Sequence, residues 1–347
     1  MKKILLGLVL LIFVLSACVS PTPTEPPAKP TKAPKAEVVE EVKEEGAFRK
    51  AQNGRPFRFA QFMQQHPVMK LMSEGFLQAC EDFDVLCVIE GVDGDDDSLV
   101  VSSLERMTAE DTSGATIGLW YPARFEAAKI AIEQGVPVVG VHAPIDRENV
   151  PTLLAWSAPD VAGFSGAAGK ALAEKVACQG PIAVSQTDLN EMQNEVQAVF
   201  REKLLEECPD IEILEMAVMG LDLPVSISLA VGVFQAHPDI TGDFSSDGNG
   251  GIYWSEGARE AGLDPNDVAI IGMDYTRPNL DLVASGDVWM LVGQPLYEEN
   301  YFAVALLVSN LMGLPIPYEN HMPAPLITLE NIDQFYAIND AAEARGE

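Results

Sequence analysis

Positive charge is scarce in this sequence. Lys and Arg together number 22 against 52 Asp and Glu, so the formal net charge at pH 7 is −30. A chain with this balance repels a nucleic-acid backbone or an anionic lipid surface. Nucleic acid is therefore not an expected partner.

Histidine and cysteine are also sparse, and their spacing matches no metal site. No pair of the five Cys has the spacing of zinc ligands, and the four His are scattered: His66, His142, His237 and His321. The glycine-rich segment 248–251 lacks the Lys-Ser/Thr of a P-loop and the spacing of a dinucleotide fingerprint. Neither a Gly-x-Ser-x-Gly elbow nor a His-Glu-x-x-His motif occurs. We expect no metal, no cofactor and no enzymatic activity.

The longest apolar run near the start, residues 4–15, is too short to span a bilayer, which takes roughly 20 residues. It follows Lys2 and Lys3 and ends in small residues, as a secretory signal peptide does. Residues 15–18, Leu-Ser-Ala-Cys, resemble the lipobox of bacterial lipoproteins, in which the Cys is acylated and becomes the first mature residue. We predict a signal peptide over 1–17, a lipid on Cys18 and an extracytoplasmic, membrane-anchored protein. The alternative is an ordinary signal peptide with an incidental Cys.

Residues 18–54 have the composition of a tether. Large apolar side chains are almost absent, Glu, Lys and Ala dominate the second half, and six prolines occupy the first half: Pro21, Pro23, Pro26, Pro27, Pro30 and Pro34. Such a segment cannot bury enough surface to fold. We predict that 18–54 is disordered.

The remaining residues, about 290, are enough for two domains. Apolar runs predict strands at 57–62, 85–89, 115–119 and 136–141, with helices at 68–83, 99–107 and 124–134 between them. The rhythm restarts after Pro159, with strands at 182–186, 211–216, 241–245, 268–273 and 289–292 and helices at 161–176, 191–207, 225–235, 250–261 and 279–285. This alternation predicts an α/β fold of two Rossmann-like lobes with parallel sheets, whose ligands bind beyond the carboxyl ends of the strands.

Four phrases in the second half resemble the ribose-type periplasmic sugar-binding proteins, of periplasmic binding protein type I. They are Ala-His-Pro-Asp-Ile at 236–240, Phe-Ser-Ser-Asp at 244–247, 256–263 and 268–274. The resemblance covers roughly 55–330 and is looser in the first half. It implies a three-strand hinge, one lobe of 55–158 plus 295–322, and another of 159–294 plus 323–340.

The resemblance also implies the function. Members of this family are monomeric solute-binding proteins that close around a small polar molecule and deliver it to the membrane permease of an ABC transporter. The expected ligand is a monosaccharide. A sensory protein that presents the ligand to a chemoreceptor or kinase and an extracytoplasmic hydrolase are the alternatives.

Polar and aromatic residues after the predicted strands are the candidate ligand-binding residues, since ring faces pack on sugars and carboxylates accept hydroxyl protons. They are Gln65, His66, Trp120, Tyr121, His142, Asp188, Asn190, Asp247, Asn249, Asp274 and Gln294. For each, a solvated turn, a helix cap or ordinary packing is the alternative. His142-Ala143 stands where the family has Asp-Arg, and its Arg near 194–196 is missing. The identity of the sugar is therefore open.

Four cysteines remain after Cys18: Cys80, Cys87, Cys178 and Cys208. An exported chain permits disulfides, but four cysteines allow three connectivities, and buried free thiols are the alternative. Cys178 and Cys208 each precede a strand of the second lobe, so both are expected at one end of adjacent strands. We predict a bridge between them.

The lipid assignment predicts that Cys18→Ser abolishes membrane anchoring, because Cys18 is the only thiol beside the cleavage site. Cell fractionation measures this, with Thr22→Ala as the control that stays in the membrane fraction. A Cys18→Ser variant found in that fraction would contradict the lipoprotein assignment.

Overall fold

The computed structural model describes residues 46–91, 96–119 and 121–346. The predicted signal peptide, Cys18 and most of the predicted tether lie outside the described residues, as does Trp120. In the described part of the chain, each helix is too short or too polar to cross a membrane.

The first lobe is built on a six-stranded parallel sheet in the order β11-β5-β4-β3-β1-β2. Its strands are β1 (Phe57–Gln61), β2 (Cys87–Gly91), β3 (Gly114–Gly118), β4 (Val138–Val141), β5 (Ala155–Pro159) and β11 (Glu319–Met322). Its helices are α1 (Ala47–Gln52), α2 (Pro67–Asp82), α3 (Asp97–Glu105), α4 (Pro122–Glu133) and α10 (Leu296–Leu311). The apolar side chains of α3 and α4 belong to one cluster and those of α2 and α10 to another, so the sheet is covered on both faces.

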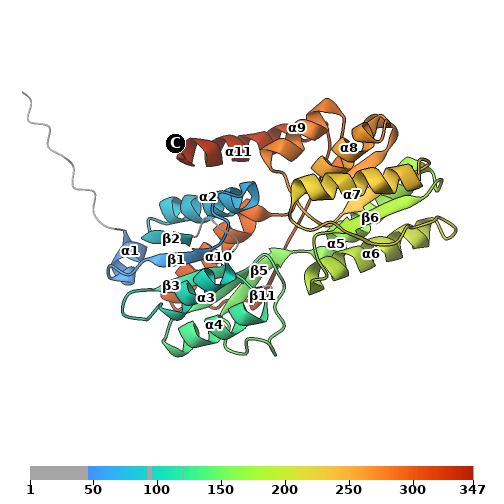
Figure 1. Cartoon of the computed structure of the whole chain (residues 1–347). Coiled ribbons are helices and arrows are strands. Elements are labelled where there is room, and N and C mark those ends of the chain that lie inside the picture. Colours follow the sequence, from blue (N-terminus) through green and yellow to red (C-terminus); the bar gives the residue numbers. More distant parts are fainter. Residues whose placement is uncertain (1–45, 92–95, 120, 347) are drawn as a thin grey trace, which may run out of the picture. The chain divides into compact units, whose positions relative to one another are not determined.

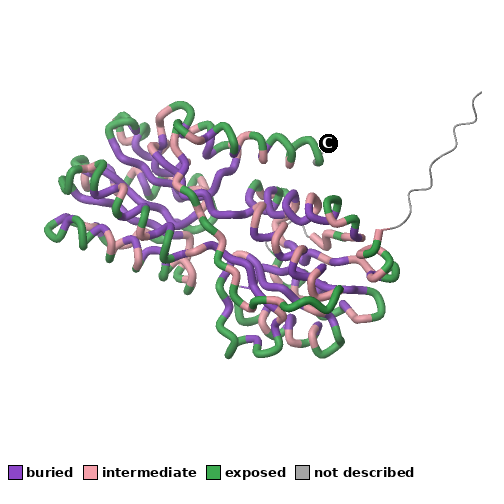
Figure 2. Tube along the Cα trace, turned by 180° about the vertical axis from the view of Figure 1, so that it is seen from behind, coloured by how far each residue is buried: buried purple, intermediate pink, exposed green. Residues whose placement is uncertain are grey.

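The second lobe repeats this plan in the order β12-β10-β9-β8-β6-β7, with only β12 antiparallel. Its strands are β6 (Ile182–Gln186), β7 (Ala217–Val218), β8 (Gly242–Ser245), β9 (Ala269–Met273), β10 (Met290–Val292) and β12 (Leu326–Ile327). Its helices are α5 (Val161–Val176), α6 (Glu191–Glu207), α7 (Leu223–Ala236), α8 (Gly250–Glu260), the 3₁₀ turn η1 (Pro265–Asp267), α9 (Arg277–Ser285) and α11 (Asp333–Gly346). Figure 2 shows the inner strands of both sheets buried beneath helices whose outer sides are exposed, whereas the edge strands β2, β7 and β11 are only partly buried.

The chain passes between the two sheets three times. The passages follow β5, β10 and β11, so α10 and β11 return to the first sheet and β12 to the second. Helices α2 and α10 pack closely enough that a Cβ on Gly75 would lie 2.0 Å from the Tyr297 carbonyl oxygen. Two Rossmann-like lobes joined by three strands are the fold that the sequence predicts.

Most expected elements are present, and their ends are shifted by at most two residues. The predicted strand at 211–216 is wrong. The buried residues in this segment are Ile211 and Leu214, which lie three positions apart. Residues on one face of a strand lie two positions apart, so this burial pattern does not fit a strand. The chain follows β6 through one bridge between Ile182 and Ile213 and forms only the two-residue strand β7. Strand β5 was not expected, although all five of its residues are buried.

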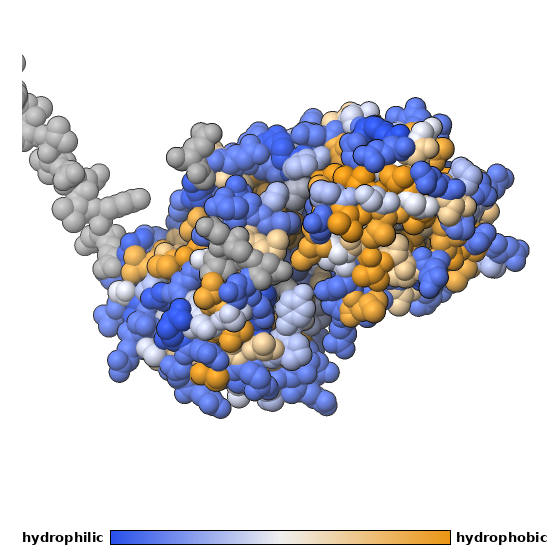
Figure 3. All heavy atoms as spheres, viewed as in Figure 1, coloured by the Kyte–Doolittle hydropathy of each residue, from blue (hydrophilic) through white to orange (hydrophobic). Residues whose placement is uncertain are grey.

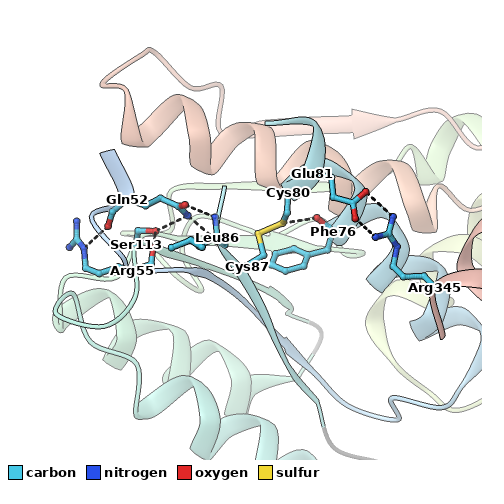
Figure 4. Close-up of a disulfide and its surroundings, with 9 residues drawn as sticks. All are labelled: Gln52, Arg55, Phe76, Cys80, Glu81, Leu86, Cys87, Ser113 and Arg345. Carbon is cyan, nitrogen blue, oxygen red and sulfur yellow. Dashed lines mark hydrogen bonds and ion pairs between the residues drawn. A yellow bond between two sulfur atoms is a disulfide. The ribbon is translucent and has the colours of Figure 1, made fainter. Parts of the chain in front are cut away.

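Helix α1 lies inside the segment predicted to be a tether. Gln52 anchors it: its side-chain amide accepts from the Leu86 N–H at 2.6 Å and donates to the Leu86 carbonyl at 2.9 Å (Figure 4). Because Gln52 is fully buried, the folded domain begins before residue 54.

Two disulfides tie helix ends to neighbouring segments. Cys80 near the end of α2 is bonded to Cys87 at the start of β2 (Figure 4), and Cys178 after α5 is bonded to Cys208 after α6. The second bridge is the expected pair, and it closes a loop of 30 residues. A loop of that length corresponds to roughly 3–4 kcal/mol of stabilisation in the chain-entropy model.

The C-terminal helix α11 runs from α9 toward α2 (Figure 1). Its Asp340 and Glu343 pair with Arg277 of α9, and its Arg345 pairs with Glu74 and Glu81 of α2. The guanidinium of Arg345 meets both Glu74 oxygens, at 2.5 and 3.0 Å. Helix α11 thus connects a helix of each lobe.

These ion pairs differ in burial, which predicts different effects on stability. The side chain of Glu74 is 3% exposed, whereas the partners of Arg277 are 69% and 59% exposed. Arg345→Ala should lower the free energy of unfolding by about 1–3 kcal/mol, because it leaves a buried carboxylate unpaired. Arg277→Ala should cost about 0–1 kcal/mol.

Urea denaturation measures both variants, and Glu74→Gln added to Arg345→Ala should recover part of the loss. Equal effects of the two Arg substitutions would contradict the role assigned to Glu74.

Candidate functional site

A cavity of ≈ 200 Å³ lies at the carboxyl ends of the strands and is lined from both lobes. Residues after β1, β3 and β4 line it from the first sheet, and residues after β6, β8, β9 and β10 from the second. Parallel sheets with this topology bind ligands at this edge. We take this cavity as the candidate site.

The first-lobe wall is mainly apolar. Phe62 and Met63 follow β1, and Val68 and Met69 open α2. His66 caps α2, its Nδ1 accepting from the Val68 N–H at 3.3 Å. Burial lowers the pKa of His66, which keeps its ring neutral at pH 7.

The opposite wall carries polar groups that bond to one another. Asn190 caps α6 by accepting from the Gln193 N–H at 2.8 Å. The Gln193 amide accepts from the Thr187 N–H at 3.0 Å and donates to the Ser246 carbonyl at 3.1 Å. Asp188 accepts from the Asn190 amide. This network fixes the loop after β6.

Asp247 sits at the end of β8 on a buried hydroxyl network. Its Oδ2 accepts from Tyr253 at 2.6 Å and from Ser245 at 3.1 Å, and its Oδ1 accepts from the Asn249 N–H at 2.9 Å. Burial raises the pKa of Asp247, and these donors oppose the rise. Both carboxylate oxygens of Asp247 therefore already accept hydrogen bonds from the protein.

Asp274 follows β9 and differs from Asp247 in one respect. Its side chain lines the cavity and is 4% exposed, yet its Oδ1 has no hydrogen-bond partner among the described residues. Burial raises the pKa of Asp274 to about 7; His142 opposes the rise, whereas Asp247 and Glu299 add to it. Its backbone is left-handed, with φ 69°. Such backbone strain in non-glycine residues concentrates at functional sites.

His142 directly follows β4 and has the same left-handed conformation, with φ 71°. Its Nδ1 lies 2.9 Å from Oε1 of Glu299, a fully buried residue near the start of α10. Burial alone would lower the pKa of His142, but the carboxylates of Glu299 and Asp274 raise it overall. We assign an ion pair of protonated His142 with Glu299.

Comparison with known proteins identifies the family. A family model described as a periplasmic binding protein domain matches residues 59–315, about three quarters of the chain. The chain belongs to the periplasmic binding protein family. No curated protein sequence matches it.

Several solved structures share the fold of this periplasmic binding protein. A sugar-binding protein of a sugar ABC transporter from Bacillus halodurans is 21% identical with a TM-score of 0.73, over 81% of this chain and 100% of that one. An arabinose-binding protein from Geobacillus stearothermophilus is 22% identical, with a TM-score of 0.72 over 81% and 99%. A solute-binding protein from Actinobacillus succinogenes with bound D-allose is 17% identical, with a TM-score of 0.74 over 81% and 100%.

This family membership confirms the predicted fold and the predicted class. The family is one of periplasmic, and therefore extracytoplasmic, binding proteins and not of enzymes. No group of His, Cys, Asp and Glu suited to a metal ion occurs among the residues that the structure describes.

The structure brings most of the predicted site residues to one cavity. Those that line it are His66, Tyr121, His142, Asp188, Asn190, Asp247, Asn249, Asp274 and Gln294. Gln65 is exposed and does not line the cavity. Trp120 is outside the described residues. Whether these side chains hold a ligand stays a prediction.

Sequence reasoning missed the apolar lining and the buried second layer. The lining residues that it missed include Phe62, Met63, Met69, Met192, Gln193 and Leu221. Met192 and Gln193 come two and three residues after Asn190, in the first turn of the helix that Asn190 caps. The helix cap was therefore the sequence signal that could have indicated them. No signal indicated Glu299, which meets His142 across 157 positions of sequence.

The geometry predicts that Asp274→Asn stabilises the unliganded protein. A carboxyl whose folded-state pKa is about 7, above the ~3.9 of an unfolded chain, contributes stability that is lost as the pH rises through about 7. At pH 8 the variant should be more stable than the natural protein by about 1–3 kcal/mol. The difference should shrink toward pH 4.

Asp243 on β8 provides the matched control, because it is fully buried, has no partner for either oxygen in the described part and does not line the cavity. Burial raises its pKa well above the ordinary value. Asp243→Asn should therefore also stabilise at pH 8 but leave ligand binding unchanged. Denaturation curves at pH 8 and pH 5 measure both variants. A less stable Asp274→Asn protein at pH 8 would show that its carboxylate supports the fold.

Proposed function

We propose that this periplasmic binding protein captures a monosaccharide or a similar small polyol and delivers it to the permease of an ABC transporter. The observation that carries the proposal is the cavity between two sets of strand ends, with Asp274 and Gln294 among the residues that line it. Proteins of the same fold are described with D-allose, D-arabinose or myo-inositol bound.

Closure of the two lobes around the ligand is part of the proposal. His66 and His142 line the cavity from the first lobe and Asp247 and Asp274 from the second, so one ligand can contact both. A ligand that contacts both lobes favours the arrangement in which they are close. The three passages between the sheets are the hinge in this proposal.

Delivery to a membrane protein is supported by exposed apolar side chains beside the cavity. Leu221 lines the cavity and is 58% exposed, and Val225 and Leu229 continue along the outer side of α7. Figure 3 shows apolar side chains gathered over α7 and next to it. Exposed apolar patches of this kind mark interaction sites. We assign this surface to the permease.

The proposal includes anchoring by a lipid on Cys18 and action as a monomer. The Leu-Ser-Ala-Cys motif at 15–18 and the proline-rich segment that follows support anchoring. A tether of that composition keeps the folded domain near the membrane while leaving it free to reorient.

A thermal-shift screen against pentoses, hexoses, polyols and nucleosides tests the function. At least one compound should raise the melting temperature, since a ligand that binds only the folded state stabilises it. Calorimetric titration should then show one site per chain. A screen in which no sugar or polyol binds would contradict the proposed function.

Gly248→Ala tests the location of the site without changing its charge. A Cβ at Gly248 would lie 2.5 Å from the Asp274 Oδ2, so the carboxylate has to move. Binding of the ligand from the screen should weaken about tenfold or more, which corresponds to ~1.4 kcal/mol. Gly232→Ala on α7 is the control, because nothing lies within 4 Å of its Cβ. Unchanged affinity in the Gly248→Ala variant would place the site elsewhere.

A further inference from the structure

The cavity has an unbalanced set of charges. Among the described residues that line it, three are Asp (Asp188, Asp247 and Asp274), two are His, and none is Lys or Arg. His66 is neutral and the charge of His142 is matched by Glu299. The cavity therefore presents carboxylates that no cation of its own lining balances.

The arginine beside the first-lobe wall does not correct this balance. The Cζ of Arg124 lies 4.4 Å from the centre of the Phe62 ring, and its Nε donates to Asp97 at 2.5 Å. It is 1% exposed and does not line the cavity. Its charge is matched by Asp97.

The three carboxylates are not equivalent. Asp247 is held by Tyr253, Ser245 and the Asn249 N–H, and Asp188 accepts from Asn190. Of these three, only Asp274 combines near-complete burial with an oxygen that lacks a partner in the described part of the chain. A buried acceptor in this state is costly unless a ligand supplies the donor.

The surroundings of Asp274 favour a charged donor. Asp247 and Glu299 both act on Asp274 as like charges, and only His142 opposes them. A neutral hydroxyl leaves that repulsion in place when Asp274 is ionised. A protonated amine removes it and also makes a charge-assisted hydrogen bond, which is stronger than a neutral one.

We propose that the ligand carries a protonated amine that pairs with Asp274, and that within the carbohydrates the protein selects an amino sugar over its neutral parent. This inference rests on the proposed function, because it concerns the same cavity and narrows its ligand class. The apolar side chains of Phe62, Met63, Met69 and Met192 receive the C–H faces of the sugar ring.

Matched sugars test the inference directly. Calorimetric titrations compare glucosamine with glucose and N-acetylglucosamine, and galactosamine with galactose and N-acetylgalactosamine. At least one amine should bind about tenfold or more tightly than its neutral parent, as a charged hydrogen bond in a buried site implies. Acetylation should remove the advantage because it removes the charge.

Two variants separate pairing with Asp274 from general attraction to an acidic protein. Asp274→Asn should bring the amine and its neutral parent to within about threefold of each other. Asp210→Asn, at an exposed position outside the cavity, should keep the natural preference. An amine preference that survives Asp274→Asn would overturn the assignment of the amine to Asp274.

The titrations distinguish this inference from the proposed function. Neutral sugars that bind as tightly as the amines, or more tightly, would overturn the inference and leave the proposed function standing. If no amino sugar binds and no sugar or polyol of the thermal-shift screen binds either, both are overturned.

Discussion

The carboxyl ends of two parallel sheets meet around Asp274, and its buried carboxylate constrains the rest of the site. Asp274 has a left-handed backbone conformation directly after β9. The negative charges of Asp247 and Glu299 raise its pKa, and its Oδ1 has no hydrogen-bond partner in the described residues. Gly248 is needed beside it, since any side chain there would collide with Oδ2. These conditions cost stability and prepare a strong acceptor for a ligand.

The structure offsets this cost away from the cavity. Each lobe has its own disulfide, one at the end of α2 and one joining the ends of α5 and α6. Helix α11 pairs with α9 through Arg277 and with α2 through Arg345. These bonds stabilise the fold without contacting the strained residues of the cavity.

His142, which stands where the ribose-type proteins have the Asp of an Asp-Arg pair, is paired with a second buried residue. His142 faces Glu299, a residue that reaches it from α10 after the chain has returned to the first lobe. The electrostatics of the cavity therefore depend on α10, a helix that the chain forms only after it has passed back to the first lobe.

Local patterns in the sequence determined the two-lobe α/β fold and many of the cavity residues. Strand and helix periods are local, and in a parallel sheet the residue after a buried strand falls at the ligand-binding edge, which is why Asp247 and Asp274 could be placed there. The strand prediction was wrong at 211–216, where the spacing of the buried residues does not match a strand. Helix α1 was not predicted, because its segment has the composition of a tether. Only the tertiary structure decided which groups face one another: Glu299 against His142, Tyr253 beneath Asp247, and an unpartnered oxygen on Asp274. Those contacts arise from packing between different helices and strands, and such packing produces no periodic pattern in the sequence.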